Sequence, residues 1–118
     1  MKTRSIVCLA VVFAMAIPLQ AQERRLGSLE FTNAGAPSAQ AAFLKGVLLL
    51  HSFEFEDAAM EFRSAQEADP DFALAYWGEA MTYNHPLWRQ QDRGAALEAL
   101  GRYGATPEAR QDRAPSER

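Results

Sequence analysis

Apolar side chains recur with the period of an α-helix along most of residues 38–104. The clearest pattern lies in residues 54–68, where apolar positions are spaced at i, i+3, i+4, i+7 and i+10 and therefore share one helical face. These positions are Phe55, Ala58, Ala59, Phe62 and Ala65. Charged side chains occupy the opposite face, so the segment is predicted to be an amphipathic helix. Asp69-Pro70 ends it, because the residue before a proline is disfavoured in the α conformation.

Three further helices are predicted, at residues 39–52, 72–84 and, more weakly, 92–103. Ser38 is the predicted N-cap of the first. The apolar positions of this first helix form two neighbouring stripes, which indicates that it has partners on two sides. Gly46 lies inside it, where glycine costs about 1 kcal/mol relative to alanine. We therefore expect the backbone of a second helix to approach closely at Gly46.

Residues 105–118 carry the signal of another helix start. Thr106 has the chemistry of an N-cap, and Pro107 suits the first helical position. No apolar face follows before Arg118, so this stretch is predicted to be a polar tail or the start of a further, truncated helix. We expect the natural chain to be longer.

The first 21 residues have the layout of a secretory signal peptide. Lys2 and Arg4 form the positive start, residues 6–17 form an apolar run of 12, and Ala21 is a small residue suited to cleavage. Such a run is shorter than the roughly 20 apolar residues that span a bilayer. The chain is therefore predicted to be exported, periplasmic or secreted, without a stable membrane anchor. Retention as an anchor is the alternative interpretation, and residues 22–37 are predicted to be a linker.

Charge and cysteine content limit which partners and which kinds of site are expected. The whole chain has 12 basic and 15 acidic residues, and Lys2 and Arg4 lie in the predicted signal, so the mature chain would carry a net charge of −5. Nucleic acid is therefore not an expected partner, since its binding depends on clustered Lys and Arg. Cys8, the only cysteine, also lies in the predicted signal. Disulfides, thiolate metal sites and cysteine nucleophiles are excluded from the predicted mature chain.

A partial internal repeat of 34 residues is the strongest signal in the sequence, and it aligns Phe43 with Trp77, Gly46 with Ala80, and His51 with His85. One helical hairpin per 34 residues, with small, aromatic and proline residues at these spacings, resembles the tetratricopeptide repeat. The residues that match its signature are Gly46, Ala58, Phe62, Ala65 and Pro70, with Phe55 as the aromatic that opens the second helix. The amino-acid sequence of residues 48–88 is also similar to that of a group of exported bacterial tetratricopeptide proteins. The resemblance implies an all-α fold of antiparallel helical hairpins, stacked as a short solenoid over residues 38–104.

The chain departs from the family pattern at several positions. Ala42 replaces the usual tryptophan, while Lys45 and Glu79 stand where a leucine is usual. An insertion around residues 85–88 interrupts the second unit, and Trp88 is predicted to be a hydrophobic plug beneath that loop. We expect Lys45 and Glu79 to form an ion pair, because they hold matching places in adjacent repeats.

The resemblance also implies where a partner would bind. The first helix of each hairpin lines a groove in this family, and the groove residues carried onto this sequence are Phe43, Val47, Leu50, His51, Leu74, Trp77, Met81, Asn84 and His85. The implied partner is a protein or peptide, or the remainder of a longer chain. The alternative is that further helices of a longer chain cover these residues as core. The subgroup that clamps a terminal carboxylate uses Lys and Asn, whereas this groove has Phe43, Val47 and Trp77.

Catalytic and metal-binding interpretations have weaker support. His51 and His85 occupy equivalent places one repeat apart, and Glu54 or Glu79 would complete a metal site in principle. Histidine at a helix C-terminus is more simply explained by capping and the helix dipole. The predicted function is therefore an exported protein-interaction module without cofactor, metal or catalysis of its own. The alternative is part of a larger exported enzyme or metal-binding protein with a site near His51 and His85.

Overall fold

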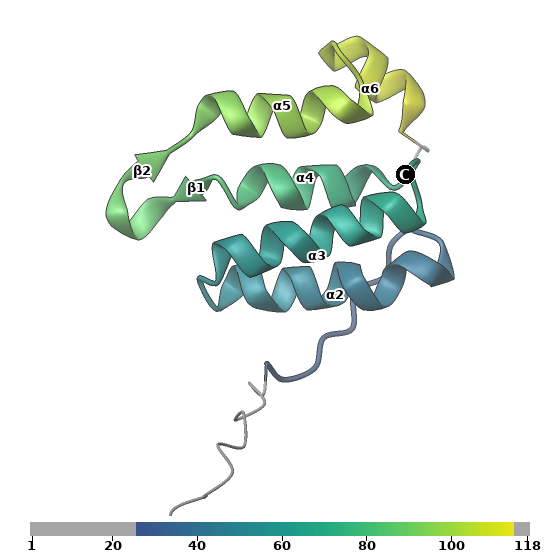
Figure 1. Ribbon diagram of the computed structural model, residues 1–118. Coiled ribbons are helices and arrows are strands. Elements are labelled where there is room, and N and C mark those ends of the chain that lie inside the picture. The colour runs from purple at the N-terminus through teal and green to yellow at the C-terminus, as the bar shows by residue number, and fades with distance from the viewer. Residues whose placement is uncertain (1–25, 115–118) are drawn as a thin grey trace, which may run out of the picture.

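The computed structural model describes residues 26–114, so the predicted signal peptide lies outside the described residues. The described part is mostly helical, which confirms the predicted helical class (Figure 1). Its elements, in chain order, are α2 (Pro37–His51), α3 (Phe55–Ala68), α4 (Ala73–Met81), β1 (Asn84–His85), the 3-10 helix η1 (Pro86–Trp88), β2 (Gln90–Gln91), α5 (Arg93–Tyr103) and α6 (Pro107–Arg113). No helix within residues 26–114 is long and apolar enough to cross a membrane.

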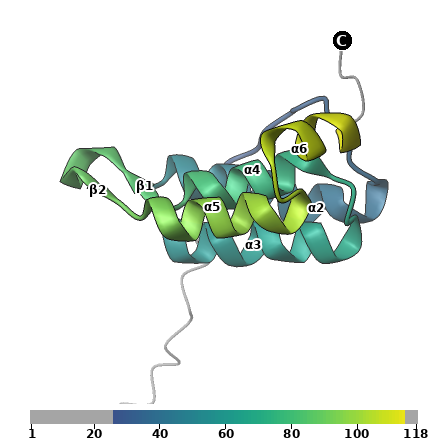
Figure 2. The same ribbon diagram turned by 90° about the horizontal axis from the view of Figure 1, so that it is seen from above.

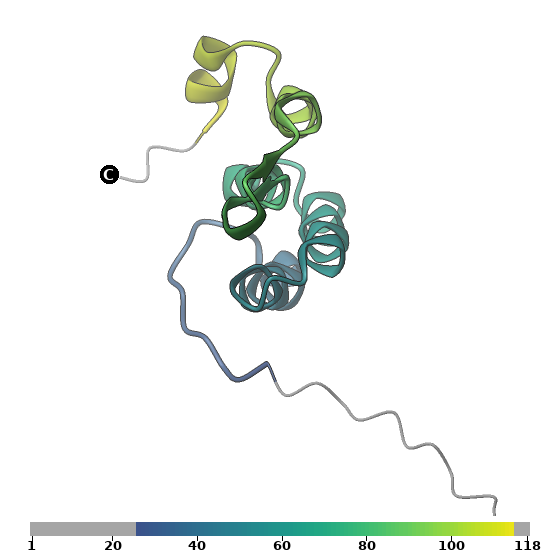
Figure 3. The same cartoon turned by 90° about the vertical axis from the view of Figure 1, so that its left-hand side faces the viewer.

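The helices pack as two successive antiparallel hairpins. Helices α2 and α3 form the first, α4 and α5 form the second, and α3 also packs against α4 (Figure 1). Viewed along the helix axes, α2 and α4 lie on one side of the stack and α3 and α5 on the other (Figure 3). Strands β1 and β2 form a small antiparallel ladder that projects beyond the helices at one end (Figure 2).

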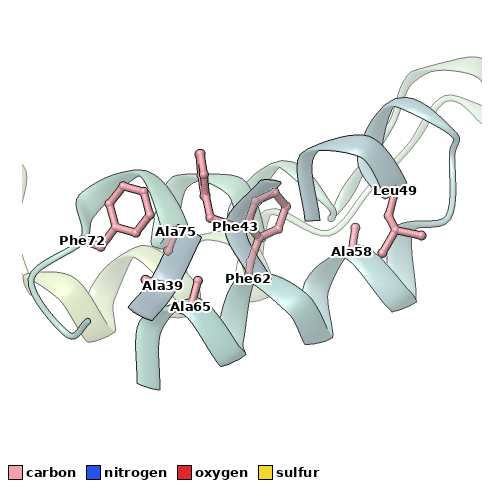
Figure 4. Close-up of a cluster of buried hydrophobic side chains, with 8 residues drawn as sticks. All are labelled: Ala39, Phe43, Leu49, Ala58, Phe62, Ala65, Phe72 and Ala75. Atoms are coloured by element: carbon pink, nitrogen blue, oxygen red, sulfur yellow. The ribbon is translucent and has the colours of Figure 1, made fainter. Parts of the chain in front are cut away.

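The core lies where α2, α3 and the start of α4 meet (Figure 4). Phe43 sits between Phe62 and Phe72, with ring centroids 5.9 and 4.7 Å away. Burial of each such ring contributes about 1.5–3 kcal/mol. The remaining buried members are small or aliphatic: Ala39, Leu49, Ala58, Ala65 and Ala75. The small residues let the helices approach closely around the three phenylalanine rings.

Gly46 does permit a close approach, but of a side chain and not of the expected helix backbone. A Cβ atom at Gly46 would lie 3.0 Å from the Phe62 ring, and one at Gly78 of α4 would overlap the same ring. Phe62 therefore fills a space that two glycines, on α2 and α4, leave open. This arrangement connects the first hairpin to the second.

Several helix ends differ from the predictions. Helix α2 begins at Pro37, one residue before Ser38, because proline is preorganised for the first helical position. The predicted cap is therefore wrong, and the Ser38 hydroxyl donates instead to the carbonyl of Ala68 at 3.5 Å. Helix α4 stops at Met81, before the predicted end at Asn84. The predicted start of α6 is confirmed, since Thr106 Oγ1 accepts from the Ala109 N–H at 3.2 Å.

Candidate functional site

The strongest candidate surface is formed by apolar residues of α2 and α4, which lie side by side (Figure 3). We call it the α2–α4 face and define it by Val47, Leu50, Leu74, Trp77 and Met81. Helical spacing places Val47 and Leu50 on one stripe of α2, and Leu74, Trp77 and Met81 on one stripe of α4. Trp77 is 49% exposed and the other four are half-buried. Five of the nine predicted groove residues therefore form a partly accessible apolar surface.

Phe43 does not belong to this accessible surface, which corrects the prediction. It is only 1% exposed, and Phe72 packs against its ring at a centroid distance of 4.7 Å. Phe31, from the segment before α2, lies against Phe43 at 5.7 Å. The residue that aligns with Trp77 in the repeat is thus part of the core, because neighbouring segments cover it.

Residues 26–36, most of the predicted linker, pack against the first hairpin. Leu26 contacts the core cluster, and the side-chain amides of Asn33 and Gln40 form a reciprocal pair at 2.9 and 2.7 Å. The Gln40 amide also donates to the Gly35 carbonyl at 2.7 Å. The Ala36 N–H donates to Asp69 Oδ2 at 2.8 Å, so this end of the segment is tied to α2 and to the turn after α3.

The other three predicted groove residues lie at the C-terminal end of α2 and in the turn that follows α4. His51 is exposed at the end of α2, and Asn84 accepts a hydrogen bond from the Gln91 side chain at 3.0 Å within the β1–β2 ladder. The ring of His85 stacks on Phe55 at 4.0 Å with an interplanar angle of 20°. His85 Nε2 lies 2.9 Å from the Thr82 carbonyl oxygen. Across residues 26–114, no three His, Cys, Asp or Glu side chains are grouped to hold a metal ion.

An aromatic cluster surrounds His85. Phe53 and Trp88 each make edge contacts with Phe55, with centroids 6.2 Å apart in both pairs. Trp88 is 56% exposed, so its predicted role as a plug beneath the loop is wrong. The 3-10 helix η1 holds Trp88 out at the tip of the turn instead of beneath it. Phe53 adopts a φ of 61°, a left-handed conformation that a bulky side chain rarely takes.

Glu79 is the most deeply buried charged residue of the described chain, with a side chain 1% exposed. Its carboxylate accepts from Arg63 Nε at 2.8 Å, from Gln66 at 2.7 Å and from Arg102. Burial by itself would raise the pKa of Glu79, but hydrogen bonds from Arg63, Gln66 and Arg102 hold it below its ordinary value. The network joins α3, α4 and α5.

The predicted ion pair between Lys45 and Glu79 is wrong. Lys45 pairs with Glu61 of its own hairpin, with Nζ and Oε1 2.5 Å apart. The equivalence of Lys45 and Glu79 in the repeat does not bring them together, because α3 supplies a nearer partner to each residue. Those partners are Glu61 for Lys45 and Arg63 for Glu79.

A cleft of about 560 Å³ lies between α3 and the turn that carries β1 and β2. Its apolar wall includes Phe55, Ala59 and Met60. Arg63 also lines it, but this guanidinium is already bonded to Glu79 and to the Tyr83 hydroxyl, at 2.8 and 3.0 Å. The sequence pattern does not predict this cleft, because its two walls come from separate segments that only the chain turn after α4 brings together.

No family model matches the chain, and no curated protein or solved structure matches it at a significant level. The function is therefore inferred from the contacts and exposed surfaces of residues 26–114.

Proposed function

We propose that this protein is an exported helical-repeat module of the tetratricopeptide type, which binds another protein through the α2–α4 face and catalyses no reaction of its own. The stacked hairpins α2–α3 and α4–α5 support the repeat assignment. So does the burial of Ala58, Phe62 and Ala65, which stand at the small and aromatic positions of the repeat signature. The layout of residues 1–21 supports export.

The exposure of Trp77 carries the proposal of a binding role. Tryptophan buries a large area when it is covered, and it is enriched among the residues that dominate the affinity of protein interfaces. Trp77 is 49% exposed, with half-buried Leu74 and Met81 on the same stripe of α4. The core of the first hairpin is formed by other residues, so Trp77 is available to a partner.

The experiment compares Trp77→Ala with Trp88→Ala. The two tryptophans are similarly exposed, at 49% and 56%, but lie on different parts of the molecule, so each variant loses one exposed indole. The wild-type protein and both variants are immobilised, and the proteins that they capture from an extract of the source cells are identified by mass spectrometry. The protein captured in largest amount by the wild type is then purified, and its binding to the wild type and to each variant is measured by calorimetric titration. We expect Trp77→Ala to weaken direct binding at least tenfold and Trp88→Ala to leave it unchanged.

Equal binding of the purified partner to wild type and Trp77→Ala would overturn the proposed site. Circular dichroism of both variants separates a loss of binding from a loss of fold.

A further inference from the structure

We propose that the partner of the α2–α4 face is an extended peptide segment with an aromatic side chain, and that residues 26–32 of this chain occupy part of its binding site until it displaces them. This inference rests on the function proposed above, because it specifies the chemistry of the partner. Its basis is that residues 26–32 already lie on the α2 and α4 side of the stack (Figure 3), where Leu26 packs against the core cluster and Phe31 against Phe43.

The contact between Phe31 and Phe43 indicates which kind of side chain the position against Phe43 accepts. Phe31 lies on Phe43 with ring centroids 5.7 Å apart and planes tilted by 56°, which is a favourable aromatic geometry. Phe31 nevertheless remains 44% exposed. The position therefore accepts an aromatic side chain, but the chain's own residue fills it only in part.

The burial pattern of the segment is that of an extended peptide. Residues 26–32 form neither helix nor strand, and the chain turns at Gly27, whose φ is 86°. After this turn Leu29 is half-buried, Glu30 is exposed and Phe31 contacts Phe43, so alternate side chains of residues 29–31 face the protein. An extended backbone directs successive side chains to opposite sides, which produces this alternation. A helical partner would instead present side chains from successive helical turns, whereas residues 26–32 contain no helical residue.

The hydrogen bonds divide the segment into a fixed part and a loosely held part. Asn33 and Gly35 are tied to Gln40, and Ala36 is tied to Asp69. Among the described residues, the backbone N–H groups of residues 26–32 donate no hydrogen bond to the helices. Side-chain contacts such as those of Leu26 and Phe31 hold this part in place, so it is the part that a competing peptide can displace.

A partner also has more surface available than residues 26–32 use. Trp77 remains 49% exposed with the segment in place. A longer peptide that seats an aromatic side chain on Phe43 and continues to Trp77 would cover both rings. It would therefore bury more apolar surface than the chain's own segment, which favours its exchange.

The test uses a fluorescein-labelled peptide with the sequence of residues 26–35, added to the full chain and followed by fluorescence anisotropy. Wild type is compared with the double variant Leu26→Ala/Phe31→Ala, in which the competing segment has lost its apolar contacts. We expect the double variant to bind the peptide at least tenfold more tightly, because an attached competitor has a high effective concentration. A control peptide with alanine in place of the phenylalanine should bind neither protein.

Asn33→Ala is the second variant, because it loosens the same segment without altering an aromatic ring. We expect a smaller, several-fold gain in peptide affinity, and circular dichroism checks that each variant is folded. The matched control Phe53→Ala removes a half-exposed phenylalanine from the aromatic cluster around His85 and should leave peptide affinity unchanged.

Equal peptide affinity in wild type, Asn33→Ala and the double variant, or no binding to any of them, would overturn the inference. The proposed function fails separately, when binding of the purified partner does not depend on Trp77.

Discussion

The buried carboxylate of Glu79 on α4 accepts a hydrogen bond from Arg63 Nε on α3 at 2.8 Å. The same carboxylate also accepts from Gln66 and from Arg102, so one side chain connects three helices of the stack. The two arginine side chains are 48% and 43% exposed, which lets water solvate their outer atoms while the carboxylate stays dry. The second hairpin is therefore held against the first by a polar contact as well as by the apolar core.

Glu79→Gln is expected to lower the free energy of unfolding by about 1–3 kcal/mol, because it removes charge-assisted hydrogen bonds while keeping the shape of the side chain. The two arginines are partly solvated, so the loss should stay below that of a fully buried ion pair. Urea denaturation measures it. Glu61→Gln, which breaks the more exposed pair with Lys45, is the control and should cost less than about 1 kcal/mol.

Stability is expected to fall at acidic pH in a way that depends on Glu79. Its pKa in the folded protein lies below the ordinary value, so the carboxylate stabilises the fold above the unfolded-state pKa of about 4.3 and loses this effect as pH falls through the lower folded-state value. The free energy of unfolding, measured from pH 7 to about pH 3, should decline less steeply in Glu79→Gln than in wild type. Parallel curves for the two proteins would contradict this assignment.

Gly78→Ala is expected to destabilise the protein by about 1–3 kcal/mol, although alanine favours a helix, because the added methyl group would overlap the Phe62 ring. Gly101→Ala on α5 is the matched control. No atom lies within 4 Å of a Cβ placed at Gly101, so this substitution should stabilise the protein by about 0.5–1 kcal/mol. Thermal unfolding of both variants checks the prediction, which fails if their midpoints shift in the same direction.

Phe43→Ala and Trp77→Ala are expected to differ in their effect on the free energy of unfolding. Phe43 is 1% exposed, and truncating a buried phenylalanine costs about 3–5 kcal/mol. Trp77 is 49% exposed, so its loss should cost less than about 1 kcal/mol. Chemical denaturation of the two variants gives the comparison. Similar losses would indicate that Trp77 belongs to the core and that the α2–α4 face is not a free surface.

Sequence reasoning located the helices well because helix formation depends on local features. The spacing of Phe55, Ala58, Phe62 and Ala65 predicted α3 to within one residue at its start. Thr106 and Pro107 predicted the start of α6, since an N-cap and a first-turn proline act through neighbouring backbone groups. The predicted N-cap at Ser38 was wrong because Pro37, which also favours the start of a helix, begins α2 one residue earlier.

The pairing of side chains between segments could not be predicted in the same way. Lys45 and Glu79 hold matching places in the repeat, yet Lys45 pairs with Glu61, and Glu79 with Arg63 and Arg102. Repeat equivalence describes the position of a residue within its own unit, whereas an ion pair depends on which side chain of a neighbouring helix is nearest. The packing of the helices determines that distance.

The amino-acid pattern by itself determined the helical segments, because apolar period, capping and proline breaks depend on residues close together in the sequence. Their pairing into hairpins was implied only by the resemblance to a repeat family. The tertiary structure decided which aromatic residue is free. Phe43 and Trp77 are equivalent in the repeat, but Phe31 and Phe72 cover the first while the second stays half-exposed. Exposure depends on contacts between residues distant in sequence, and those contacts exist only once the segments before α2 and after α3 have packed against the helices.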